Sequence, residues 1–99
     1  MSWLNKTYGC GDNYTGEAID GQPNGNGTME YADGSRFIGQ FIDSIPNGHG
    51  THTLANGDVY SGIFSGGQLN GMGNVYYKNG QLYTGLFKDG QPVNQISRL

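Results

Sequence analysis

The chain has 99 residues, enough for one domain, and carries a formal net charge of −3, with 13% charged and 12% aromatic residues. A net negative charge argues against binding to nucleic acid or anionic lipid through bulk electrostatics. The 19 glycines and 3 prolines approach the composition of a disordered chain, but disordered segments are poor in aromatic residues, so the spacing of the glycines decides whether the chain folds.

The N-terminal residues and the cysteine count predict the cellular setting. Residues 1–6 lack the apolar core of a secretory signal, and no apolar run approaches the length of a membrane-spanning helix. The single cysteine, Cys10, cannot form an internal disulfide. We therefore expect a reducing, cytoplasmic setting.

A unit of 23 residues recurs from Tyr14 onward. An aromatic residue opens each unit, a glycine follows two residues later, and alanine or phenylalanine follows two residues after that. These positions hold Tyr14, Gly16 and Ala18; Phe37, Gly39 and Phe41; Tyr60, Gly62 and Phe64; and Tyr83, Gly85 and Phe87. The glycines are therefore periodic, which excludes the disordered interpretation.

The period divides the chain within one structural domain. Residues 1–13 form an N-terminal half repeat, and full repeats span 14–36, 37–59 and 60–82. Residues 83–99 hold a partial fourth repeat and a C-terminal tail, in which Asn94 and Ile96 stand at two glycine positions of the pattern.

Each unit is predicted to be a β-hairpin. Asp33-Gly34, Asn56-Gly57 and Asn79-Gly80 are typical of the primed two-residue turns, which need positive φ. The second connection, as at residues 20–23 and 88–90, is predicted to be longer and looser and to join one hairpin to the next.

Alternation along the strands sorts the side chains onto two faces. In residues 60–64, Tyr60, Gly62 and Phe64 share one face, while Ser61 and Ile63 share the other, which is mostly polar along the chain. A ring that lies over a glycine of the neighbouring strand shields the exposed backbone. The predicted fold is all-β, an elongated single-layer antiparallel sheet of consecutive hairpins.

The unit Tyr-x-Gly-x-Phe, Asp-Gly, Asn-Gly-x-Gly, Tyr-x-Asn-Gly resembles the MORN repeat (membrane occupation and recognition nexus) over residues 8–94. Two departures occur: phenylalanine or alanine stands where the family often has tryptophan, and Ser44 replaces a turn glycine. The resemblance implies an elongated sheet of hairpins with an aromatic-lined groove. It also implies scaffolding or docking beside membranes, cytoskeleton or enzyme domains, without catalysis.

No residue cluster predicts an active site, a metal site or a cofactor. His49 and His52 form an H-x-x-H pattern, but residues three apart on a strand point to opposite faces. His52 is expected in the groove, at the repeat position of Met29 and Val75. Asp20, Asp43 and Asp89 recur with the period, and turn formation explains them better than a calcium ladder does.

The predicted function is non-catalytic docking of a partner protein or peptide on the aromatic groove, as an adaptor or small inhibitor. The residues assigned to partner binding are Tyr14, Tyr31, Phe37, His52, Tyr60, Tyr77 and Tyr83. Those assigned to the fold are Gly16, Gly39, Gly62, Gly85, Phe41, Phe64 and Phe87. The alternative, suggested by the family name, is peripheral phospholipid binding, although Lys6, Arg36, Lys78, Lys88 and Arg98 are few and scattered.

The ends of such a sheet predict self-association. An unprotected edge strand invites pairing with another chain, and the N-terminal strand around Trp3 and Leu4 is apolar for an edge. The tail carries Ile96 and Leu99. We expect a homodimer through one end of the sheet, with packing of the aromatic faces as the second possible route.

Overall fold

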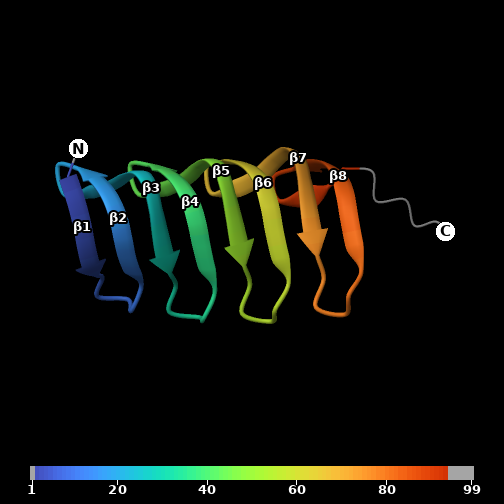
Figure 1. Ribbon diagram of the computed structural model, residues 1–99, viewed down its shortest axis with the longest axis horizontal. Coiled ribbons are helices and arrows are strands. Elements are labelled where there is room, and N and C mark those ends of the chain that lie inside the picture. Colours follow the sequence, from blue (N-terminus) through green and yellow to red (C-terminus); the bar gives the residue numbers. More distant parts are fainter. Residues whose placement is uncertain (1, 94–99) are drawn as a thin grey trace.

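The computed structural model describes residues 2–93 and shows one antiparallel sheet of nine strands in chain order (Figure 1). The sheet is elongated, with principal extents of 49 × 23 × 17 Å, because each strand pairs only with its neighbours in the chain. The predicted fold class is confirmed. The strands are β1 (Ser2–Thr7), β2 (Asn13–Ile19), β3 (Gln22–Glu30), β4 (Arg36–Ile42), β5 (Ile45–Thr53), β6 (Val59–Ser65), β7 (Gln68–Tyr76), β8 (Leu82–Lys88) and β9 (Gln91–Pro92).

The turns that contain Asp-Gly or Asn-Gly differ from the prediction. Between β3 and β4, the Gly34 N–H donates to the Tyr31 carbonyl at 3.0 Å and the Tyr31 N–H donates to the Ser35 carbonyl at 2.9 Å. Gly34 has φ of +93°, whereas Asp33 does not have positive φ. The loop is therefore a three-residue hairpin with glycine in its last position, and not a primed two-residue turn. The loops before β2, β6 and β8 repeat this hydrogen bonding.

The primed geometry occurs instead in the second set of turns, which were expected to be longer and looser. Ile19 pairs with Gln22, so only Asp20 and Gly21 lie between β2 and β3, with φ of +52° and +77°. A two-residue turn with positive φ at both positions follows the twist of its strands, which explains the tight connection. The same geometry recurs at Asp43-Ser44, Gly66-Gly67 and Asp89-Gly90.

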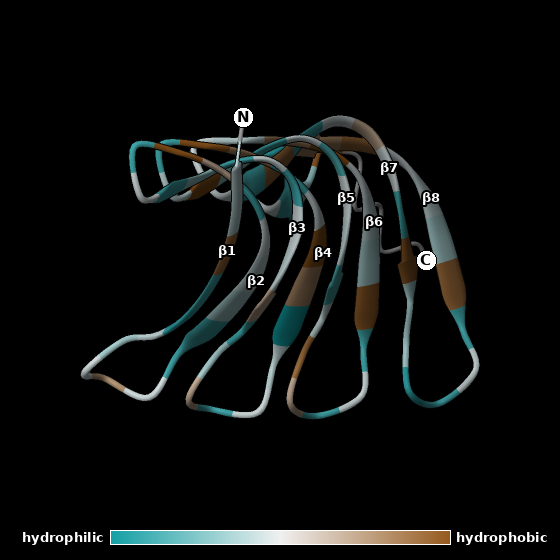
Figure 2. Ribbon diagram, turned by 60° about the vertical axis from the view of Figure 1, so that its left-hand side comes forward, coloured by the Kyte–Doolittle hydropathy of each residue, from teal (hydrophilic) through white to brown (hydrophobic). Residues whose placement is uncertain are grey.

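Every long hairpin bends along its length, so the sheet forms a trough (Figure 2). The register between β2 and β3 shifts after Gly16, which marks a β-bulge, and equivalent shifts follow Gly39 and Gly62. A bulge bends its strand and increases the local twist. At Gly16 the strands approach so closely that a Cβ would lie 2.7 Å from the carbonyl oxygen of Asn26.

The core lies on the inner face of the trough. The rings there meet edge to face, with centroids 5.2 Å apart for Tyr14 and Phe41 and 4.8 Å apart for Phe37 and Phe64. Such contacts add about 0.5–1.5 kcal/mol each beyond burial of area. A single layer can therefore hold a core because the bend folds its inner face upon itself. The buried apolar residues are Tyr14, Ala18, Met29, Phe37, Phe41, Phe64, Leu69, Val75 and Phe87.

The outer face is less polar than predicted toward the C-terminal end. Met72 pairs with Leu86, and Tyr76 pairs with Leu82. All four side chains are exposed on the outer face, from 45% to 58%. Alternation assigns a side chain to a face, but it does not require the solvent-facing side to be polar. No helix of the described residues is long and apolar enough to span a membrane.

Candidate docking groove

In the first two repeats the opening ring covers a glycine pair. A Cβ on Gly27 would overlap the Tyr14 ring, and a Cβ on Gly50 would overlap the Phe37 ring. The Tyr14 hydroxyl also donates a hydrogen bond of 2.6 Å to the carbonyl of Glu17. These two rings are therefore part of the inner packing of the sheet.

The third repeat breaks this arrangement at Leu69. A Cβ added to Gly62 would lie 3.0 Å from Leu69 Cδ1, and a Cβ added to Gly73 would lie 3.0 Å from Leu69 Cδ2. Leu69 thus covers the glycine pair that the Tyr60 ring would otherwise cover. The Tyr60 hydroxyl has no hydrogen-bond partner among the described residues, and its ring instead meets Phe87 edge to face at 6.4 Å. The other repeats have proline at the Leu69 position, at residues 23, 46 and 92.

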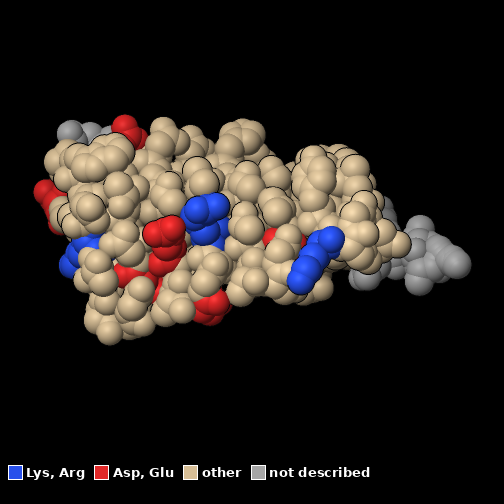
Figure 3. Space-filling view, turned by 60° about the horizontal axis from the view of Figure 1, so that its bottom comes forward, with Lys and Arg blue, Asp and Glu red and all other residues tan. Residues whose placement is uncertain are grey.

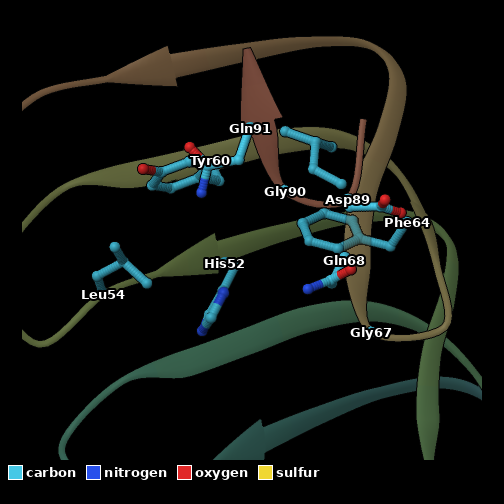
Figure 4. Close-up of a pocket in the computed structure, with 10 residues that line it drawn as sticks. His52, Leu54, Tyr60, Phe64, Gly67, Gln68, Asp89, Gly90 and Gln91 are labelled. Atoms are coloured by element: carbon cyan, nitrogen blue, oxygen red, sulfur yellow. The ribbon is translucent and has the colours of Figure 1, made fainter. Parts of the chain in front are cut away.

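A pocket of about 250 Å³ opens beside the displaced Tyr60 ring (Figure 4). It is smaller than the roughly 300–1,000 Å³ of sites for drug-sized ligands, so it fits one side chain or a small group. Its walls come from β5 and the loop after it, from β6, and from the starts of β7 and β9 with the turns that precede them. They include His52, Leu54, Tyr60, Phe64, Gln68 and Asp89.

His52 forms part of the pocket wall, in surroundings that favour its neutral form. Its ring meets those of Tyr31 and Phe37 edge to face, at 5.9 Å and 6.5 Å. Burial lowers the pKa of His52 from its usual value, and the Asp33 carboxylate partly opposes this shift. The Nε2 atom is buried without a hydrogen-bond partner among the described residues. Burial likewise raises the pKa of the Tyr60 hydroxyl, with smaller contributions from Tyr77 and Asp58.

His49 lies on the outer face of β5, opposite Ile63. It therefore does not share a metal with His52, whose side chain faces inward. The described residues contain no group of three or more His, Cys, Asp or Glu side chains placed to hold a metal ion.

The turn aspartates tie neighbouring repeats together. Asp12 accepts a hydrogen bond of 2.8 Å from the backbone N–H of Ala32, and Asp58 accepts one of 2.8 Å from that of Lys78. In the other row of turns, the N–H of Asp89 donates to Asn70 Oδ1 at 3.0 Å. The aspartates that recur with the period, Asp20, Asp43 and Asp89, all have positive φ in the two-residue turns, in line with the turn-forming interpretation.

The structure divides the predicted partner-binding residues into two groups. Tyr14 and Phe37 are 0% and 1% exposed, so neither offers surface to a partner. Both residues are therefore excluded from the candidate site. Burial under neighbouring rings is the physical reason, and the repeat pattern alone did not reveal its depth. Half-buried positions on the inner face hold Tyr31, His52, Tyr60, Tyr77 and Tyr83.

Several residues of the pocket wall are not among the predicted partner-binding residues. Leu54, Gln68, Leu69 and Asp89 were not assigned to the site, although all four line the pocket. One signal in the sequence indicates Leu69, which interrupts a periodic row of prolines. Of the residues assigned to the fold, the phenylalanines Phe41, Phe64 and Phe87 are core residues, each only 2–3% exposed.

Comparison with known protein families gives one result. The model of the MORN repeat matches three consecutive segments, residues 14–36, 37–59 and 60–82. No individual curated protein matches the chain.

Proposed function

Because the chain belongs to the MORN-repeat family, whose repeats are generally binding or scaffold modules and usually non-catalytic, we propose that it docks a partner protein or peptide in its aromatic groove. It would act as an adaptor, or as a small inhibitor that covers the surface of a larger protein. The observation that carries the proposal is the open pocket on the inner face, where half-buried rings meet free polar side chains.

The composition of the inner face supports a protein partner. Tyrosine offers a large contact area with few rotatable bonds and a polar tip, and it is enriched at protein interfaces. Tyr60 and Tyr83 are half-buried, so their rings are held by the fold while an edge stays accessible.

The distribution of basic residues favours a protein over a phospholipid surface. Figure 3 shows Lys and Arg side chains apart from one another and interspersed with acidic ones on the face in view. Lys6 lies over the ring of Tyr8, with Nζ 5.0 Å from its centroid, and Arg36 lies 3.9 Å from Glu30. A lipid-binding surface would need a cluster of basic side chains.

The groove proposal is tested by comparing a variant of each face. Wild type captures partners from the native cell, and affinity for the purified partner is then measured for Tyr60→Ala and for Met72→Ala on the outer face. We expect Tyr60→Ala to weaken binding and Met72→Ala to leave it unchanged. The reverse result would place the interface on the outer face, and flotation with acidic liposomes at low but not high salt would support the lipid alternative.

We also propose a homodimer that forms through the edge strand β1. Trp3 is 69% exposed on this strand, and β1 pairs on one side only, with β2. The tail residues Ile96 and Leu99, which entered the same prediction, lie outside the described residues. Light scattering at high protein concentration checks the proposal: a mass of 10.6 kDa would show a monomer and contradict it.

A reducing, cytoplasmic setting is part of the proposal and is supported by the lone Cys10, which is an exposed free thiol. A membrane-impermeant maleimide should label Cys10 in lysed cells but not in intact ones. Labelling of intact cells would contradict the assignment.

A further inference from the structure

We propose that the pocket beside Tyr60 binds the guanidinium group of an arginine side chain that the partner inserts into it. This inference rests on the proposed docking function and specifies the chemistry of the partner's anchor. Its basis is the combination of aromatic rings, a free carboxylate and two free amides around a cavity sized for one side chain.

The rings supply the first half of such a site. Tyr60 and Phe64 both line the pocket (Figure 4), and Tyr60 is available because Leu69 occupies its place over the glycine pair. A guanidinium group is planar and weakly hydrated, and it stacks on aromatic faces more readily than an ammonium group does.

The Asp89 carboxylate supplies the second half. The Asp89 backbone N–H donates to Asn70, which holds the turn in place, but its carboxylate has no hydrogen bond or ion pair among the described residues. Of the eight acidic residues, six accept a hydrogen bond or pair with a cation, namely Asp12, Glu17, Glu30, Asp33, Asp43 and Asp58. Asp20 and Asp89 are the two without such a contact within residues 2–93, and Asp89 is the one that lines the pocket.

The remaining polar groups of the pocket also suit a cation with several N–H donors. The side chains of Gln68 and Gln91 line it and make no hydrogen bond within the described residues. Their amide oxygens can accept further N–H groups of a guanidinium ion whose fork pairs with Asp89. Among the described residues no Lys or Arg side chain lines the pocket, and the burial that lowers the pKa of His52 favours its neutral form, so these residues place no cation against an arginine there.

The experiment titrates the full chain with N-acetyl-argininamide at low ionic strength and follows backbone amide shifts by NMR. N-acetyl-citrullinamide is the matched probe, because it keeps the shape and loses the charge. We expect argininamide to shift the amides of Tyr60, Phe64 and Gln91, and citrullinamide to bind at least about tenfold more weakly.

Two variants complete the design. Asp89→Asn keeps a side chain that tolerates the positive φ of +50° and should weaken argininamide binding at least about tenfold. Asp20→Asn makes the same change in net charge at the same repeat position, with φ of +52°, and should leave binding unchanged. If both variants lost argininamide affinity equally, the net charge of the protein would explain binding, and the proposal would be overturned.

Equal binding of the two probes, shifts that map away from the pocket, or no shift at all would also overturn it. These results leave the docking function standing if a partner still binds in a Tyr60-dependent manner. Conversely, a pocket that takes argininamide while Tyr60→Ala leaves partner affinity unchanged would contradict the docking function and keep the guanidinium site.

Discussion

The ring of Tyr14 lies over Gly27 so closely that a Cβ on the glycine would overlap it. The contact joins two neighbouring strands, and Tyr14 is 0% exposed. The periodic aromatic and glycine positions are therefore two halves of one packing arrangement, in which a side chain from one strand uses the space that the next strand leaves empty.

Gly27→Ala should destabilise the fold by about 2–3 kcal/mol, because the new methyl group displaces a fully buried ring. Gly9→Ala is the control, since a Cβ there meets nothing within 4 Å and the backbone has no positive φ. Urea unfolding of both variants measures the difference. Equal stability of the two would show that the ring can move aside without cost.

Ser44→Gly should stabilise the chain by about 1 kcal/mol. Ser44 is the only turn residue at its repeat position that is not glycine, and its φ of +74° lies in the left-handed region that L-residues adopt at a cost of roughly 1–2 kcal/mol. Ser65→Gly, at an exposed strand position, should instead destabilise by about 0.5–1 kcal/mol. Thermal melts of the two variants should shift in opposite directions; a fall in both would contradict the strain at Ser44.

Leu69→Pro should return the third repeat to the packing of the first. Without the leucine side chain, the Tyr60 ring can move over Gly73 as Tyr14 lies over Gly27, and its hydroxyl can reach the Ile63 carbonyl. The pocket would then lose its Tyr60 wall. Nuclear Overhauser contacts between the Tyr60 ring and the Gly73 α-protons provide the measurement, and Leu69→Met, which keeps the bulk, is the control that should show none.

His52→Val should reduce the loss of stability in mild acid. Burial lowers the pKa of His52 in the folded state, so below its ordinary value of about 6.5 the unfolded chain takes up a proton that the folded chain resists. Stability should therefore fall as the pH drops from about 7 to 5. Valine fits the site in principle, because Val75 is fully buried at the same repeat position.

His49→Gln is the control for this experiment, because His49 is exposed on the outer face. We expect it to keep the wild-type dependence of urea unfolding on pH. If His52→Val kept that dependence too, the acid sensitivity would belong to other groups.

The sequence was sufficient to predict the fold because period and alternation are properties of the chain. The spacing from Tyr14 to Phe37, Tyr60 and Tyr83 placed each ring on one face, and the structure keeps them there. Turn geometry was harder to predict from the sequence. Asp33-Gly34 is a dipeptide typical of a two-residue primed turn, yet the hydrogen bonds of Tyr31 enclose a three-residue loop.

The candidate site was only partly predictable. A repeat pattern assigns the same role to equivalent positions in every repeat. The pocket arises where the third repeat differs, because Leu69 covers the glycine pair and Tyr60 does not. It also depends on rotamers: the Tyr14 and Tyr60 side chains share a residue type and a repeat position but point to different places. Such choices depend on packing between strands, which no local pattern in the sequence contains.

The strand order, in which consecutive strands from β1 to β9 pair with each other, has a consequence for how the protein folds. Each hairpin closes a short loop before its pairing begins, so the entropy lost in bringing strands together is small at every step. Chains dominated by such local pairings fold faster than sheets with distant strand partners. Pairing can begin at any hairpin and extend in both directions, and unfolding should begin at the two terminal strands, where a strand has a neighbour on one side only.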